Sequence, residues 1–126
     1  MILANAISLN MLPPDAQSGG IIFRRISADE ARRLVREAGE VVSAIGHGDT
    51  ARLVGRELGI ELPADRRNVV LGDEYVLIAQ YIGPRLPEGA TELPSGARLE
   101  WFLVRLATGE ELAGRGDMVF FPLGGR

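Results

Sequence analysis

The sequence predicts a single α/β domain of residues 1–126, in which helices flank a mixed β-sheet of about five strands. Three observations support this fold class. A chain of 126 residues has the usual size of one domain. Runs rich in β-branched and aromatic residues alternate with amphipathic segments at helical spacing. Glycines and prolines separate these runs, and 46% hydrophobic with 25% charged residues is typical of a globular protein.

The chain is expected to begin with a buried strand that runs into a loop over residues 2–12, where two prolines end the apolar run. Three polar residues interrupt this run, namely Asn5, Ser8 and Asn10. Polar groups are costly to bury unless they are hydrogen-bonded. These three side chains are therefore expected either to cap their own loop or to face a ligand.

A second strand is predicted over residues 21–26, and a helix follows it directly. Ser27 and Glu30 have the spacing of a capping box, in which each side chain accepts a hydrogen bond from the backbone of the other. Apolar residues then recur at helical spacing, so one face of this helix belongs to the core. Gly39 is the expected end of the helix.

Residues 40–45 allow two interpretations. Their β-branched side chains favour a short buried strand. The helical spacing of apolar residues also continues to position 45, so one longer helix is the alternative.

His47 is the only histidine, and it lies between two glycines directly before a predicted helix of residues 50–58. Asp49 is the expected N-cap of that helix and Gly59 its end. The free N–H groups and the positive end of the macrodipole at a helix N-terminus favour an anion such as phosphate. Histidine exchanges a proton near neutral pH, because its unperturbed pKa is about 6.5.

A β-hairpin is predicted from residues 68–71, a turn at 72–73, and residues 74–82. The second arm is apolar on both faces and is therefore expected at the centre of the sheet. Residues 98–106 are the most strand-like segment of the chain, and residues 118–121 are a candidate edge strand.

The loop of residues 83–96 is rich in proline and glycine, and we expect it to be rigid. It carries Arg85 and Glu88.

Composition excludes several classes of site. The absence of cysteine excludes disulfides, zinc thiolates and iron–sulfur clusters, and one histidine excludes the familiar multi-histidine metal sites, so no metal or cofactor is expected. A net charge of −3 disfavours binding of long nucleic acid but leaves a small anionic ligand open. We find neither a signal peptide nor a membrane segment, which predicts a cytoplasmic protein.

The remaining chemical groups suit a phosphodiester that carries its own nucleophile. The sequence contains no nucleophile elbow, no P-loop and no dinucleotide fingerprint. In RNA the 2′-hydroxyl attacks the adjacent phosphate. An enzyme then needs only to orient the ring, stabilise the charge of the phosphorane and protonate the leaving 5′-oxygen.

Three segments resemble the viral anti-CRISPR ring nucleases: residues 3–12, Ile45-Gly46-His47 followed by Thr50, and residues 83–89. The resemblance covers about residues 2–104, and residues 106–126 form a longer C-terminal strand or tail than in the viral members. It implies a homodimer that binds cyclic tetra-adenylate, the second messenger of type III CRISPR defence. It also implies metal-independent cleavage to linear di-adenylates ending in a 2′,3′-cyclic phosphate, in the host cytoplasm if the protein is viral.

The resemblance also implies roles for individual residues. His47 matches the general acid, Arg85 matches the arginine that stabilises the transition state, and Glu88 matches a glutamate that reaches the histidine across the dimer. A carboxylate there would favour the protonated imidazole. The substrate-binding positions of the family correspond to Asn5, Ser8, Asn10, Thr50, Gln80 and either Arg66 or Arg67.

This chain departs from the family pattern at Gly48-Asp49, where the family often has an acidic residue and a serine. The alternative function is a viral protein on the same fold that binds nucleic acid or a cyclic nucleotide without cleaving it.

Overall fold

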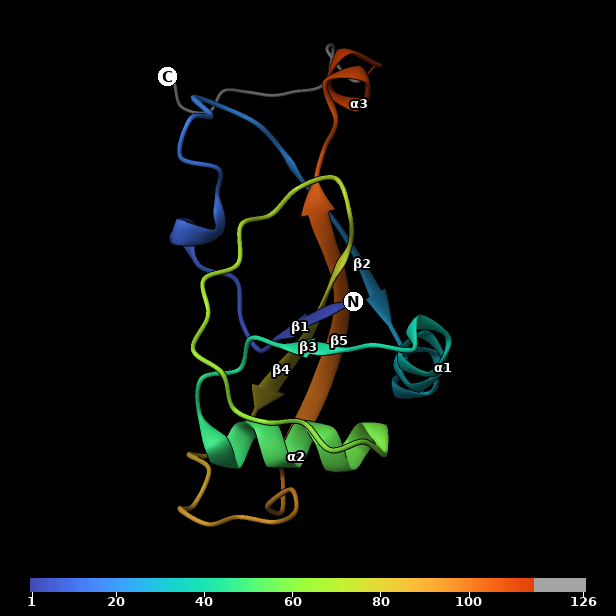
Figure 1. Ribbon diagram of the computed structural model, residues 1–126. Helices are drawn as coiled ribbons and strands as arrows, with labels where there is room; N and C mark the ends of the chain where they lie inside the picture. The colour runs from blue at the N-terminus through green and yellow to red at the C-terminus, as the bar shows by residue number, and fades with distance from the viewer. Residues whose placement is uncertain (115–126) are drawn as a thin grey trace.

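A computed structural model describes residues 1–114 as a five-stranded mixed sheet with three α-helices and one 3-10 helix (Figure 1). This confirms the α/β fold class predicted from the sequence. The strands run in the spatial order β2-β5-β4-β1-β3. They are β1 (Ile2–Ala4), β2 (Ile21–Ile26), β3 (Val42–Ser43), β4 (Val76–Ile82) and β5 (Arg98–Leu106). The helices are η1 (3-10, Leu9–Met11), α1 (Ala28–Ala38), α2 (Gly48–Leu58) and α3 (Gly109–Gly114).

The sheet divides into a parallel half and an antiparallel half. β1 lies between β3 and β4 and is parallel to both, with Leu3 opposite Ser43 on one side and Leu77 on the other. β5 is antiparallel to β4 and to β2. Because parallel strands end at the same edge of a sheet, the segments that follow β1, β3 and β4 leave the sheet together.

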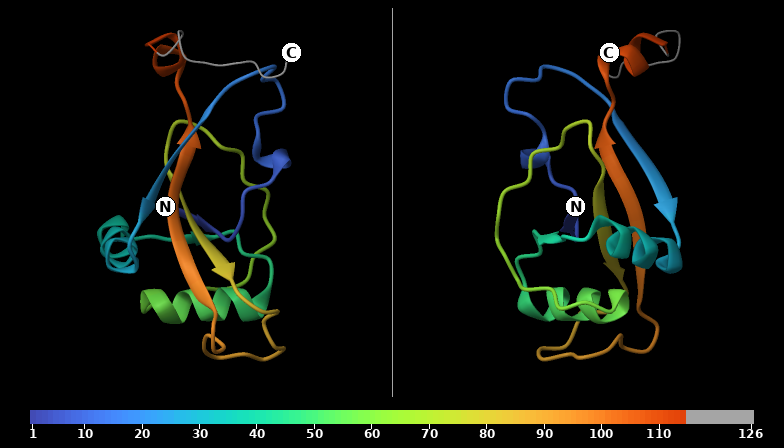
Figure 2. Two further views of the ribbon diagram at one scale, coloured as in Figure 1. Left: turned by 180° about the vertical axis from the view of Figure 1, so that it is seen from behind. Right: turned by 45° about the vertical axis from the view of Figure 1, so that its right-hand side comes forward.

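Helices α1 and α2 cover one face of the sheet (Figure 2). Their apolar residues pack against alternate residues of the strands, as the two-residue period of a β-strand requires. The buried residues of this larger core cluster are Leu3, Ile26, Ala31, Val35, Ile45, Ala51, Val54, Leu58, Leu62, Leu77, Ala79, Trp101 and Leu103.

The capping signal of α1 is confirmed in part. Ser27 is the N-cap, and its Oγ accepts from the Glu30 N–H at 3.1 Å. The carboxylate of Glu30 instead pairs with Arg24 at 3.5 Å and Arg33 at 3.7 Å, so the reciprocal half of the capping box was wrong.

Gly39 ends α1 as predicted, with a φ of +77° that side chains other than glycine adopt at a cost. The two-residue strand β3 follows. This decides between the two interpretations of residues 40–45 in favour of the strand.

A second cluster covers part of the opposite face, over β1 and β4. Met11 of η1 packs there with Val69 and Leu71, and the Leu71 N–H donates to the Met11 carbonyl at 2.8 Å. The prediction of a buried strand that runs into a loop is confirmed for residues 2–12. The strand β1 ends at Ala4, and the chain then leaves the sheet and returns as η1 to cover it.

The predicted hairpin of residues 68–82 was also wrong. Residues 68–71 form no strand, and β4 pairs with β1 and β5 instead. The apolar side chains of residues 69 and 71 follow the alternation of a strand, but they cover the sheet rather than extend it. The central position of β4 and the strands at 21–26 and 98–106 are confirmed.

Within the described residues, no helix covers the rest of that face, over β2 and β5. Phe23 is 65% exposed and Ile21 45% exposed, and Phe23 meets Phe102 edge to face with 6.4 Å between ring centroids. The guanidinium carbon of Arg25 lies 4.6 Å from the centre of the Phe102 ring. We call this the open sheet face.

Beyond β5 the chain turns into α3, at the end of the sheet opposite α2 (Figure 1). The predicted edge strand at residues 118–121 lies outside the described residues. Within residues 1–114, no helix has the length and apolar character needed to cross a membrane.

Candidate functional site

The candidate site is built where the three parallel strands end. Asn5 directly follows β1, His47 lies four residues after β3, and Arg85 lies three residues after β4. These strands are neighbours in the sheet, so three segments far apart in sequence leave it at one edge. Ligand sites of open α/β sheets lie at this edge.

His47 is the N-cap of α2, with an extended backbone at φ −108° and ψ 127° and an exposed side chain. Its carbonyl accepts the first helical hydrogen bond, from the Ala51 N–H at 2.9 Å. The prediction that Asp49 is the N-cap was wrong, because the helix begins two residues earlier, at Gly48. The imidazole therefore lies at the positive end of the helix, with Thr50 in the same first turn.

Arg66, rather than Arg67, contacts Gly46, the residue directly before His47. The Arg66 Nε donates to the Gly46 carbonyl at 3.3 Å, and its side chain runs so close to Gly46 that an added Cβ would lie 2.8 Å from Arg66 Cγ. The Asp65 N–H holds this loop in place by donating to the Ile45 carbonyl at 2.8 Å.

Arg67 is engaged elsewhere. Its guanidinium pairs with the carboxylate of Asp65 at 2.7 Å. Of the two arginines that the sequence left open, Arg66 is the one with a contact to the histidine segment.

The 83–97 loop lies along α2 and is bound to it by three hydrogen bonds (Figure 1). Asp49 Oδ2 accepts from the Gly89 N–H at 2.9 Å. One turn apart on the helix, Arg52 donates to the Ala90 carbonyl at 3.4 Å and Arg56 donates to the Thr91 carbonyl at 2.7 Å.

Asp49 is also paired with Arg52 at 3.1 Å. The hydrogen bond from the Gly89 N–H, and then the Arg52 guanidinium, lower the pKa of the Asp49 carboxyl from its ordinary value of 3.8. Sequence analysis predicted Asp49 to be a helix cap, and no local signal indicated a hydrogen bond with a residue 40 positions away.

Arg85 and Glu88 both lie in this loop and have exposed side chains. A turn with an Ala90 N–H to Pro87 carbonyl bond of 3.1 Å surrounds Glu88. Within the described part of the chain, neither side chain is hydrogen-bonded to His47. The loop is bound to α2 of its own protomer, and the assignment of Glu88 to the histidine of a second copy stays a prediction.

The remaining predicted contacts divide into two groups. Gln80 lines a pocket of about 380 Å³ with Ala6 and Ile7, residues that follow Asn5 directly. Ser8 and Asn10 are exposed and hydrogen-bonded to each other at η1. Gln80 therefore adjoins the first loop, whereas Ser8 and Asn10 bond locally.

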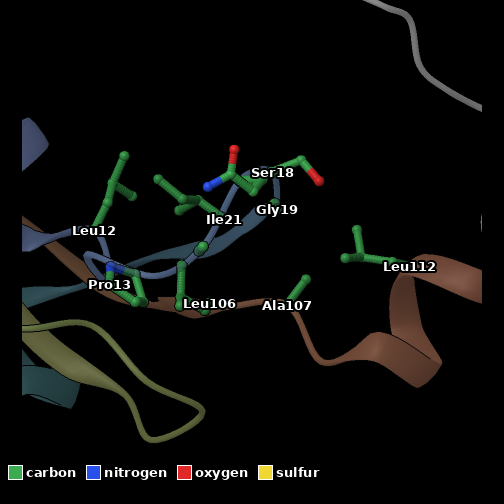
Figure 3. A pocket seen from close by; sticks show the side chains of 11 residues that line it. Leu12, Pro13, Ser18, Gly19, Ile21, Leu106, Ala107 and Leu112 are labelled. Carbon is green, nitrogen blue, oxygen red and sulfur yellow. The ribbon is translucent and has the colours of Figure 1, made fainter.

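A larger pocket of about 460 Å³ lies at the other end of β5 (Figure 3). Leu12, Ile21, Leu106 and Leu112 are among its lining residues, and none of the lining side chains is titratable. This pocket lacks the groups needed for acid–base chemistry.

Residues 1–114 contain no group of three or more histidine, cysteine, aspartate or glutamate residues that could hold a metal ion. The chemistry available at the strand edge is therefore that of an imidazole, arginines and amides.

Comparison with known proteins agrees with this architecture. The chain is 37% identical over 70 residues to the uncharacterized protein ORF117 of Acidianus two-tailed virus, a match that covers 53% of this chain and 58% of that relative. It superposes on B116 of Sulfolobus turreted icosahedral virus with a TM-score of 0.64 and 27% identity, over 82% of this chain and 97% of that one. A family model described as STIV B116-like matches residues 1–96. The chain therefore belongs to the STIV B116-like family of archaeal virus proteins.

Proposed function

We propose that the protein is a metal-independent ring nuclease that cleaves cyclic tetra-adenylate and thereby suppresses type III CRISPR immunity. One observation carries the proposal: the parallel strands β1, β3 and β4 end at one edge, from which the segments of Asn5, His47 and Arg85 leave. A proton donor, a cation and amide groups on neighbouring loops are the groups that transfer of a phosphodiester to its own 2′-hydroxyl requires.

In the proposed reaction the 2′-oxygen of one adenylate forms a bond to the adjacent phosphorus and the bond from phosphorus to the 5′-oxygen breaks. The hydroxyl proton leaves to solvent. The His47 imidazolium donates its proton to the departing 5′-oxygen, and the Arg85 guanidinium stabilises the charge that develops on the phosphorane. The product ends in a 2′,3′-cyclic phosphate.

Binding of the ring is assigned to the groups around this centre. The N-terminus of α2 offers backbone N–H groups to a phosphate, beside the exposed His47 side chain. Arg66 adds a cation through its contact with Gly46. Gln80 supplies an amide at the end of β4.

A homodimer is part of the proposal, because a ring of four repeats can present the same groups to two identical protomers. The open sheet face is the candidate interface. Its exposed apolar side chains Ile21 and Phe23, together with the adjoining Ile7, are the kind of surface that association removes from water.

The decisive experiment incubates the purified protein with labelled cyclic tetra-adenylate in EDTA and separates the products. We expect linear di-adenylate with a 2′,3′-cyclic phosphate from the wild type, and a large loss of rate in His47→Ala. Loss of activity in EDTA would contradict the metal-independent mechanism, and equal rates for both proteins would contradict the role of His47.

Binding measured in parallel separates the enzyme from the alternative, a protein that sequesters a cyclic nucleotide without turnover. A wild type that binds the ring tightly and releases it intact would establish the alternative. A wild type that neither binds nor cleaves it would refute both.

A further inference from the structure

We propose that the Asp49 carboxylate is a positioning group that holds the 83–97 loop in register with the His47 end of α2. This inference rests on the proposed function, because the loop carries Arg85 and Glu88. Asp49 touches neither of these side chains in the described contacts and acts through the backbone of Gly89.

The geometry joins the two elements at one point. The Gly89 N–H donates to Asp49 Oδ2 at 2.9 Å. Gly89 directly follows Glu88 in the loop, and Asp49 lies two residues after His47 in the helix. The Asp49 side chain is only 14% exposed, so this charge-assisted bond is partly shielded from water.

The loop is suited to being held at this position. Gly89 has a φ of +78°, and the turn before it is closed by the Ala90 N–H to Pro87 carbonyl bond. A turn with prolines has few alternative conformations, so fixing the Gly89 N–H fixes the neighbouring residues as well. The bonds of Arg52 and Arg56 act further along the loop and leave residues 85–89 without another anchor to α2 among the described hydrogen bonds.

The chain contains a matched control. Asp29 occupies the second position of α1 as Asp49 does in α2, and it pairs with Arg32 three residues later at 2.5 Å. Its side chain is 94% exposed, and its described hydrogen bond is to Arg32 alone. Asp29→Ala therefore removes a carboxylate from the same helix position, together with the same type of ion pair, without removing a loop contact.

The test measures two quantities in the full-length chain: amide exchange at Gly89 by NMR, and kcat and KM for labelled cyclic tetra-adenylate. In Asp49→Ala we expect Gly89 exchange to rise about tenfold, because a hydrogen bond to a charged acceptor is lost. We expect kcat to fall by about tenfold or more with a smaller change in KM, because a displaced loop affects the reacting geometry most.

Rescue of loop protection and of kcat by a conservative variant would identify Asp49 as a positioning residue. Asp49→Asn keeps an oxygen that accepts the Gly89 N–H, and it should retain most of the protection and of kcat, whereas Asp29→Ala should resemble the wild type in both. Unchanged Gly89 exchange in Asp49→Ala, or faster exchange with unchanged kcat, would overturn the inference. A wild type that leaves the ring intact would refute the proposed function instead, and the Gly89 measurement would still test the tether. Fluorescence of the buried Trp101 verifies that each variant is folded.

Discussion

Gly46 is the residue that determines where the Arg66 side chain lies. A Cβ at position 46 would come within 2.8 Å of Arg66 Cγ, and the obstructing atoms belong to a flexible, exposed side chain. Gly46→Ala should therefore displace Arg66 at little cost in stability. If Arg66 binds a ring phosphate, affinity for cyclic tetra-adenylate should fall about tenfold, the value of one charge-assisted hydrogen bond.

The measurement is calorimetric titration of the ring into variants made in a His47→Ala background, which prevents turnover. Gly48→Ala is the matched control, because no atom lies within 4 Å of the added Cβ. Arg66→Ala alone and combined with Gly46→Ala should give the same loss, since both remove one contact. Undiminished affinity in Gly46→Ala would show that Arg66 does not bind the ring from this position.

At the scale of residues, local chemistry predicted where His47 lies, whereas the roles of Arg85, Glu88 and the binding residues came from the family resemblance and stay predictions. The only histidine lies between glycines before a helix, and the structure confirms that it lies at a helix N-terminus. The choice between Arg66 and Arg67 could not be made from sequence, because it depends on a contact with Gly46, 20 residues away. The loop contact of Asp49 was missed for the same reason.

The packing of residues 60–62 against helix α2 depends on Gly55, on the buried side of the helix. A Cβ added to Gly55 would lie 2.7 Å from the Ile60 carbonyl oxygen and 3.0 Å from the Leu62 Cβ, and neither atom moves without the backbone. Gly55→Ala should reduce the free energy of unfolding by about 1–3 kcal/mol, despite the better helix propensity of alanine. Urea unfolding measures the loss, and Gly48→Ala in the same helix should show none of it. Stability equal to the wild type would mean that the 60–62 segment can move away from α2.

Helix α3 is joined to β5 by the bidentate pair of Arg105 and Glu111, with Nη2 to Oε2 at 2.6 Å. The bonds from Arg105, and then from the Thr108 N–H, lower the pKa of the Glu111 carboxyl from 4.5 to about 2. A group whose pKa is lower in the folded state stabilises the fold above its unfolded pKa, and the contribution is lost as pH falls toward the folded one.

The difference in Tm between the wild type and Glu111→Gln should therefore be constant above about pH 5 and shrink as pH falls from 4.5 toward 2. Thermal unfolding followed by circular dichroism at a series of pH values tests this. A difference that does not vary with pH would mean that the carboxylate charge contributes nothing.

At the scale of elements, prediction from sequence succeeded where the signal was local. The cap at Ser27, the stops at Gly39 and Gly59, and the strands at 21–26 and 98–106 depend on neighbours in sequence. The predicted hairpin at 68–82 was wrong because the alternation of apolar and polar residues indicates a buried face but not the partner that packs against it. Residues 69 and 71 alternate because they pack on Met11, far away in the chain.

Within residues 1–114, helices α1 and α2 cover one face of the sheet, whereas η1 and residues 69–71 cover only the part of the other face over β1 and β4. Phe23, 65% exposed on the open sheet face, should lie in the dimer interface if two copies associate there. Phe23→Glu should convert the dimer to a monomer, because two carboxylates would be buried against apolar side chains across the twofold axis. Its effect on the folding of one protomer should be small, since the position is already exposed.

Val70→Glu is the control, because Val70 is 51% exposed but lies on the segment that covers β1 and β4. Light scattering after size exclusion gives the mass of each variant, and a Phe23→Glu protein that remains a dimer would exclude this face as the interface. If the monomer forms and still cleaves the ring, then cleavage does not need Glu88 from a second copy.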